Sequence, residues 1–152
     1  MADAPFSCLP VTPERNDDLV ELFGPNGAYS NCWCTWWILR SREFDEHTPE
    51  ERRGILERLV SEGSEPGLLA YDGARPERGR GVASALLDAA VGFAFDRDAA
   101  FVVGHPVDTD VSDPGAAALY VGTLTMFLDA GFTEVERRGT RPVVRLEPPR
   151  PT

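Results

Sequence analysis

The chain has 152 residues, of which 42% are hydrophobic and 26% are charged, so we expect one domain, residues 1–152, with a genuine core. The net charge of −10 disfavours nucleic-acid partners. No apolar run approaches the ~20 residues that cross a bilayer, and the first residues lack the regions of a signal peptide. Three cysteines without a disulfide framework favour a reducing cytoplasm, so we expect a cytoplasmic protein with no membrane partner.

The first half of the chain predicts a strand, two helices and a second strand. Residues 6–11 have strand character, and Thr-Pro-Glu at the start of residues 12–23 is typical of a helix N-terminus. A second helix is expected after Thr48, where Glu51 can complete a capping box. The apolar run at residues 67–71 predicts a buried strand.

The second half predicts two helices that alternate with strands. Residues 81–95 are apolar nearly all round, so we expect this helix to be deeply buried. A strand over 100–104 and a helix over 119–130 follow, and Gly131 is placed to end that helix in a left-handed conformation. The last strands are expected at residues 132–138 and 141–146, joined by Gly139-Thr140 as a hairpin and followed by a loose tail, residues 146–152.

A glycine-rich turn precedes the apolar helix, and residues 71–77 before it are interpreted as a polar loop without a strand. Its bare backbone N–H groups and the positive end of the helix dipole predict a site for a phosphate or pyrophosphate. The residues expected to form this site are Arg78, Gly79, Arg80, Gly81, Val82 and Ala83.

Cysteine and tryptophan residues are concentrated in residues 31–37. Cys32 and Cys34 with nearby His47 suggest a metal site only weakly, because structural zinc uses four ligands at characteristic spacing, so we expect no metal. Alternatively, a cysteine of this pair lines an acceptor pocket. Three tryptophans have too much apolar area to stay in water, and either the core or a pocket wall accounts for them. The candidate substrate-binding residues are therefore Cys32, Trp33, Trp36 and Trp37.

Polar residues after the strand at 100–104 are further candidates. His105 is either a general base or a strand-end histidine that is hydrogen-bonded to the backbone. Asp108 and Asp110 either bind a cationic amine or act as solvated turn caps.

Several motifs together resemble the GNAT acetyltransferase family, in particular a bacterial branch of it. The resemblance covers about residues 11–146. It implies that acetyl-CoA binds with its pyrophosphate on the turn at residues 78–83 and that a deprotonated amine attacks the acetyl group directly. The matching stretches are Arg78-x-x-Gly81-x-Ala83, Asn31 to Trp37, Gly104 to Asp108, Met126 to Phe132 and Arg141 to Leu146.

The chain departs from the family pattern in two places. Too few residues separate Tyr71 from Arg78 for the two central strands that hold the pantetheine arm, so these strands are expected to be absent. The family often has a tyrosine that protonates the leaving thiolate where this chain has Phe127. Tyr120 is either its substitute or an amphipathic residue at a helix start. The open sheet edge suggests a homodimer.

The resemblance implies an abridged GNAT-like α/β fold, an α+β mixed sheet of about five strands with four helices. It also implies a small-molecule N-acetyltransferase that uses acetyl-CoA as co-substrate, with Tyr120 and His105 as candidate catalytic residues and Asp108 as a candidate amine ligand. Two alternatives remain open, since a fold does not determine a function. One is an enzyme that acts on a small molecule without acyl-CoA, and the other is a non-catalytic binding or partner subunit.

Overall fold

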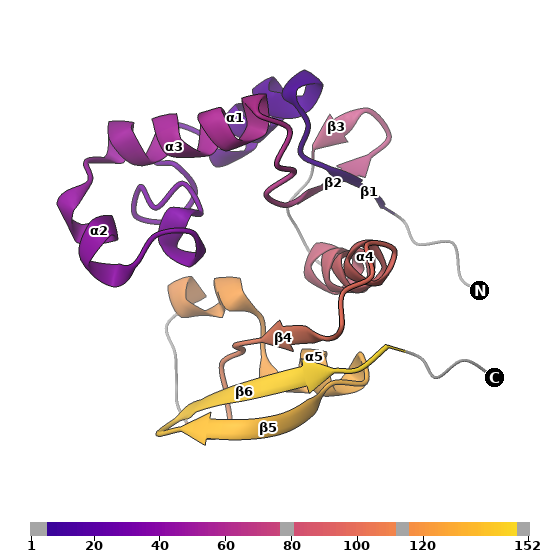
Figure 1. Ribbon diagram of the computed structural model, residues 1–152. Helices are drawn as coiled ribbons and strands as arrows, with labels where there is room; N and C mark the ends of the chain where they lie inside the picture. The colour runs from indigo at the N-terminus through magenta and orange to yellow at the C-terminus, as the bar shows by residue number, and fades with distance from the viewer. Residues whose placement is uncertain (1–5, 77–80, 112–115, 149–152) are drawn as a thin grey trace. The chain divides into compact units, whose positions relative to one another are not determined.

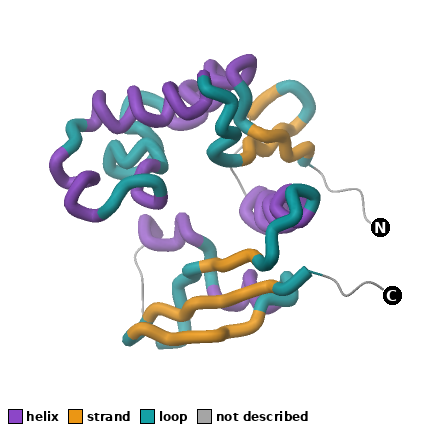
Figure 2. The backbone as a smooth tube through the Cα atoms, viewed as in Figure 1, coloured by secondary structure: helices purple, strands orange, loops and turns teal. Residues whose placement is uncertain are grey.

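The structure is a computed structural model that describes residues 6–76, 81–111 and 116–148. The chain divides into two compact units, Met1–Val82 and Ala83–Thr152, and each has its own core. Figure 1 shows the helices and strands of the chain. The described residues contain six β-strands and five α-helices, which confirms the expected α/β composition (Figure 2). The strands form two antiparallel three-stranded sheets, one in each unit.

The first unit combines three α-helices with a small sheet of order β1-β2-β3. Cys8 of β1 lies opposite Ala70 of β2, as the register of this antiparallel pair requires. The α-helical part of the first helix starts at Asn16, later than its Thr12 start signal, because Pro13–Arg15 form a 3-10 turn. The elements are β1 (Ser7–Pro10), α1 (Asn16–Phe23), α2 (Ser41–Glu46), α3 (Pro49–Ser61), β2 (Leu68–Asp72) and β3 (Arg75–Pro76).

The start of α3 confirms the predicted capping box. The Thr48 hydroxyl oxygen accepts a hydrogen bond from the Glu51 backbone N–H at 3.2 Å, and a Glu51 carboxylate oxygen accepts one from the Thr48 N–H at 2.8 Å. These reciprocal bonds satisfy two donors that the first helical turn leaves without partners. A signal of four residues therefore determined where α3 begins.

The core of the first unit joins α1 and α3 to β2. The hydroxyl group of Tyr71 donates a hydrogen bond of 2.7 Å to the carboxylate of Asp18 on α1. Burial raises the pKa of Tyr71 to about 12, and the bond to Asp18 adds to the increase. The buried residues of this core are Val11, Leu19, Trp33, Leu56, Val60, Leu69 and Tyr71.

Residues 71–77 correct one prediction, because they are not a loop throughout. β2 continues to Asp72, and the two residues of β3 pair back onto it, with Tyr71 opposite Pro76 and Asp72 opposite Arg75. A short hairpin forms here because Gly73 takes a φ of +61°, a conformation that glycine adopts without steric cost. The second strand nevertheless has only two residues, far fewer than a central strand of a sheet usually has.

The second unit packs two α-helices against a sheet of order β4-β6-β5. The predicted hairpin over the last strands is confirmed, with Gly139 at a φ of +63° in its turn (Figure 1). The pairing of β5 with β6 is irregular between Glu134 and Glu136. The elements are α4 (Val82–Phe95), which begins at the last residue of the first unit, β4 (Val102–Gly104), α5 (Leu124–Asp129), β5 (Thr133–Arg138) and β6 (Arg141–Leu146).

The core of the second unit is centred on Phe127, Phe132 and Val144. The rings of Phe127 and Phe132 meet edge to face, with 5.1 Å between their centroids. Leu87 and Val91 of α4 pack against these residues, so this helix contributes one face to the core.

The prediction that residues 81–95 form a deeply buried helix is right about the helix and wrong about its burial. Only Val82 is buried, and the other residues of α4 are half-buried or exposed. Alanines supply much of the apolar composition of this helix, and a single methyl group needs no core around it.

The predicted continuous helix over 119–130 is also interrupted. Residues 116–121 form a 3-10 helix, and Gly122 then takes a φ of +82°. The α-helical part begins after Thr123, whose hydroxyl oxygen accepts a hydrogen bond of 3.3 Å from the Met126 N–H. The left-handed conformation of Gly122 ends the first helical segment, and the threonine cap starts the second. Gly131 follows α5 at a φ of +90°, as predicted.

Candidate functional site

The second half of the glycine-rich turn leads directly into α4. Gly81 has a φ of +87°, in the left-handed region that residues with side chains rarely adopt. Val82 is buried and Ala83 is exposed. The first N–H groups of an α-helix have no acceptor within the helix, and the helix dipole favours an anion beside them. The predicted phosphate-binding residues Arg78, Gly79 and Arg80 lie outside the described residues.

A pocket of about 390 Å³ lies between α4 and α5. It begins in the first turn of α4, at Ser84, and Thr123 contributes to it immediately before α5. Its volume lies within the range of small-molecule sites, roughly 300–1,000 Å³. The lining residues are Ser84, Leu87, Asp88, Thr123, Thr125, Met126, Asp129 and Ala130.

None of the residues that line the pocket was singled out from the sequence. One signal was present, since Ser84 and Asp88 are four residues apart in an otherwise apolar helix and so share a face. Thr125 and Asp129 have the same spacing on α5. The pairing of these two polar faces could not be read from the sequence, because about 35 residues separate them and only the fold brings them together.

The two candidate catalytic residues belong to segments that are joined next to the pocket. Val107 and Thr123 form a parallel bridge. The Val107 N–H donates to the Gly122 carbonyl oxygen at 2.9 Å, and the Leu124 N–H donates to the Val107 carbonyl oxygen at 2.8 Å. His105, directly after β4, is two residues from this bridge, and Tyr120 is three residues from it on the other segment. Both side chains are exposed.

Phe127 is a core residue. Its ring lies between two glycines, and a Cβ atom added to Gly104 or Gly122 would come within 2.3 or 3.0 Å of ring atoms. A polar group on a ring enclosed in this way would need a buried hydrogen-bond partner, which explains why an aromatic residue without a polar group occupies this position.

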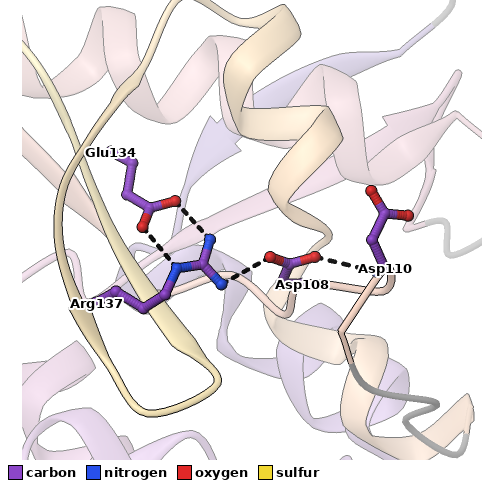
Figure 3. A network of polar contacts seen from close by, with 4 residues as sticks. All are labelled: Asp108, Asp110, Glu134 and Arg137. Atoms are coloured by element: carbon purple, nitrogen blue, oxygen red, sulfur yellow. Dashed lines mark hydrogen bonds and ion pairs between the residues drawn. The ribbon is translucent and has the colours of Figure 1, made fainter.

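Asp108 belongs to a polar network of the second unit (Figure 3). Arg137 donates to the buried Asp108 carboxylate at 2.7 Å and forms two bonds with Glu134, at 2.7 and 2.6 Å. The other carboxylate oxygen of Asp108 accepts the Asp110 N–H at 3.0 Å. These contacts, and the Arg137 bond foremost, hold the pKa of Asp108 below its usual range. The carboxylate therefore joins its loop to β5, and Arg137 already compensates the charge that was expected to attract an amine.

Replacement of Arg137 is expected to lower the free energy of unfolding at neutral pH, and the size of this loss should depend on pH. The folded-state pKa values of Asp108 and Glu134 lie below their ordinary values of about 3.9 and 4.3. Their contribution is therefore present above those pH values and is lost as the pH falls through the folded-state values. Arg137→Gln should lower the urea midpoint at pH 7, and the difference from the parent protein should shrink below about pH 4.

Arg138→Gln is the matched control for this measurement by circular dichroism. Arg138 pairs with Glu136 on the same strand, but both side chains are far more exposed. Exposed pairs contribute little, so its effect should be clearly smaller. Equal effects of the two variants would contradict a special role for the Asp108–Arg137–Glu134 network.

The three tryptophans of the first unit occupy different environments. Trp33 is only 5% exposed and packs against Phe23, with ring centroids 5.7 Å apart, so it belongs to the core. Trp37 is 60% exposed. Trp36 is also exposed and meets Phe44 edge to face at 5.0 Å. Of the two interpretations left open by the sequence, the core therefore applies to Trp33, and Trp36 and Trp37 remain candidates for binding.

The residues around the cysteine pair give no sign of a metal centre in the part of the chain that the structure describes. No group of three or more histidine, cysteine, aspartate or glutamate side chains is gathered there in a way that could hold an ion. His47 forms a hydrogen bond through Nδ1 with the Glu43 carbonyl oxygen at the end of α2. Cys32 is half-buried and Cys34 is exposed.

The second unit thus contains a pocket between α4 and α5 and two candidate catalytic residues on segments bridged at Thr123. Comparison of the chain with protein-family models, with curated proteins and with solved structures gave no significant match.

Proposed function

We propose that the protein is an N-acetyltransferase that transfers an acetyl group from acetyl-CoA to a small-molecule amine. This proposal rests on the position of the pocket. Its first lining residue, Ser84, directly follows Ala83 at the start of α4, and the pocket extends to α5. A phosphate group at the helix start and the rest of a cofactor in the pocket would then be neighbours. The motif resemblance supports the same assignment.

The proposed chemistry needs a base for the amine and an acid for the leaving thiolate. His105 is the proposed base and Tyr120 the proposed acid, since both lie within three residues of the bridge that includes the pocket residue Thr123. The amine would attack the acetyl carbonyl directly, so no nucleophilic side chain is required.

Titration with acetyl-CoA tests the proposal. At a ligand concentration of 100 times Kd the free energy of unfolding should rise by about 2.7 kcal/mol, which thermal unfolding and calorimetry can measure. Absence of any shift at millimolar acetyl-CoA would overturn the proposed function.

A charge placed at Ser84 locates the binding site. Ser84→Asp puts a carboxylate where the cofactor's phosphates are proposed to lie, and affinity should fall about ten-fold or more through like-charge repulsion. The helix itself should tolerate this change, because an acidic residue in the first turn is favourable for the dipole. Ser84→Asn is the control, since it has the size of aspartate without the charge. Equal affinities of the two variants would move the cofactor site elsewhere.

A second candidate function is binding of a small molecule without acyl transfer. Asp88 and Asp129 both line the pocket, and two carboxylates oppose a polyanionic cofactor. The two-residue β3 also provides little of the wall that holds a pantetheine arm in the family. A protein that ignores acetyl-CoA but is stabilised by small amines would favour this candidate.

The proposal includes a cytoplasmic location and a homodimer. Along the described residues, no helix is both long enough and apolar enough to cross a membrane. β2 pairs with β1 on one side, and β3 pairs only with Tyr71 and Asp72 on the other, so residues 68–70 have no strand on that second side within the described part of the chain. Such an edge can pair with a second copy. Sedimentation should show a dimer, and a monomer at high concentration would contradict it.

A further inference from the structure

The loop between α1 and the 3-10 helix Thr35–Trp37 holds two cysteines side by side. Cys32 and Cys34 flank Trp33, whose buried ring anchors the loop in the core of the first unit. The Cys34 backbone N–H points at the Cys32 sulfur, at 3.4 Å. The buried Thr35 hydroxyl donates to the Cys32 carbonyl oxygen at 2.8 Å and holds the turn closed.

The backbone of this loop is strained. Five non-glycine residues between positions 28 and 34 have φ values of +48° to +68°, a region that is costly for residues with a Cβ atom. Cys34 itself is at +53°. Gly27, at +54°, faces the Trp33 ring so closely that a Cβ atom there would lie 2.3 Å from Nε1. The packing of Trp33 thus holds a conformation that local preferences oppose, and that conformation brings the two thiols together.

The two thiols differ in their chemistry. Hydrogen bonds from the Cys34 thiol and from nearby backbone N–H groups lower the pKa of Cys32 to about 6. The same partnership raises the pKa of Cys34, because its proton is shared with the Cys32 sulfur. Cys8, on β1, has a pKa raised by burial. The Cys32 sulfur is thus suited to attack a disulfide, and the Cys34 sulfur is the one that would then close a disulfide with Cys32.

We propose that Cys32 and Cys34 form a redox-active dithiol that exchanges with low-molecular-weight disulfides of the glutathione type and closes an intramolecular disulfide. The two cysteines are two residues apart, and the Cys34 backbone N–H lies 3.4 Å from the Cys32 sulfur, so a disulfide between them requires no movement of distant parts of the chain. The proposed dithiol chemistry does not rest on the proposed acetyl transfer, whose proposed base, acid and pocket belong to the second unit.

The exchange proceeds in two displacements. The Cys32 thiolate attacks one sulfur of the small disulfide, forms a mixed disulfide, and releases the other half as a thiolate with the electron pair of the broken bond. Cys34 then gives its proton to that thiolate, and its sulfur attacks the Cys32 sulfur and expels the second thiolate, which takes a proton from water. The protein loses two electrons and two protons, and the small disulfide is reduced to two thiols.

Reaction of the reduced protein with oxidised glutathione at pH 7, followed by intact mass and peptide mapping, tests the proposal. We expect a product that has lost two hydrogen atoms, with Cys32 linked to Cys34 and with Cys8 still reduced. Cys32 should react with iodoacetamide about ten-fold or more faster than Cys8 at this pH. A fully reduced protein after prolonged treatment, or a glutathione adduct at Cys8 alone, would overturn the proposal.

Three variants separate the roles of the cysteines. Cys34→Ser should stop at the mixed disulfide and gain one glutathione at Cys32, whereas Cys32→Ser should form neither product. Cys8→Ser is the matched control and should behave as the parent protein does. Fluorescence of the tryptophans beside the pair reports whether each variant keeps its fold. A folded Cys34→Ser protein without an adduct at Cys32 would refute the assigned nucleophile.

Discussion

Replacement of Trp33 by alanine is expected to destabilise the first unit by about 3–5 kcal/mol. The side chain is only 5% exposed, and it contacts Phe23 and lies over Gly27, so its loss leaves a cavity that the surrounding α1 and α3 cannot fill. The guanidinium group of Arg53 over the same ring, 5.1 Å from its centroid, would lose its partner as well. Urea unfolding followed by circular dichroism measures the change.

Trp37→Ala is the control, because it removes the same side chain from a site that is 60% exposed. Its effect should stay within about 0.5 kcal/mol. All three tryptophans lie in residues 33–37, so fluorescence reports on the first unit alone. Comparable destabilisation by the two variants would show that Trp33 does not organise this core.

In the second unit the largest effect is expected for Phe127→Ala, again about 3–5 kcal/mol. Phe127 is 8% exposed, meets Phe132 edge to face, and lies between Gly104 and Gly122. Leu128→Ala, at a neighbouring position that is 45% exposed, should change stability far less. Hydrogen exchange of the β6 amides reports on this unit separately from the first.

Gly104 tests the same contact from the opposite side. A Cβ atom on Gly104 would lie 2.3 and 2.8 Å from atoms of the Phe127 ring, so Gly104→Ala should be strongly destabilising. Phe127→Leu shortens that side chain, and in its presence the Gly104→Ala substitution should cost less. Additive effects in this double-mutant cycle would mean that the ring and the glycine do not meet as described.

The elements that the sequence predicted well depend on neighbours along the chain. The capping box of Thr48 and Glu51 involves four consecutive residues, and the left-handed turns at Gly131 and Gly139 require only the absence of a Cβ atom. The hairpin formed by β5 and β6 follows from two short segments and the turn between them. Such signals operate at short range, so the linear pattern contains them.

The errors arose where distant contacts decided the outcome. The apolar composition of α4 predicted deep burial, but only one of its faces meets the core around Phe127. The strand at Arg75–Pro76 depends on pairing back to β2 more than on its own composition. The sequence left two roles open for Asp108, an amine ligand or a turn cap, because its partner Arg137 is 29 residues away along the chain.

The sequence by itself determined the α/β composition, the start of α3, the glycine turn before α4 and the C-terminal hairpin, since local hydrogen bonding and backbone conformation specify each of them. Only the tertiary structure decided which tryptophan is in the core, and only it showed the pocket between α4 and α5. These features depend on the burial of particular side chains against residues far away in the chain, and burial is a property of the packed molecule.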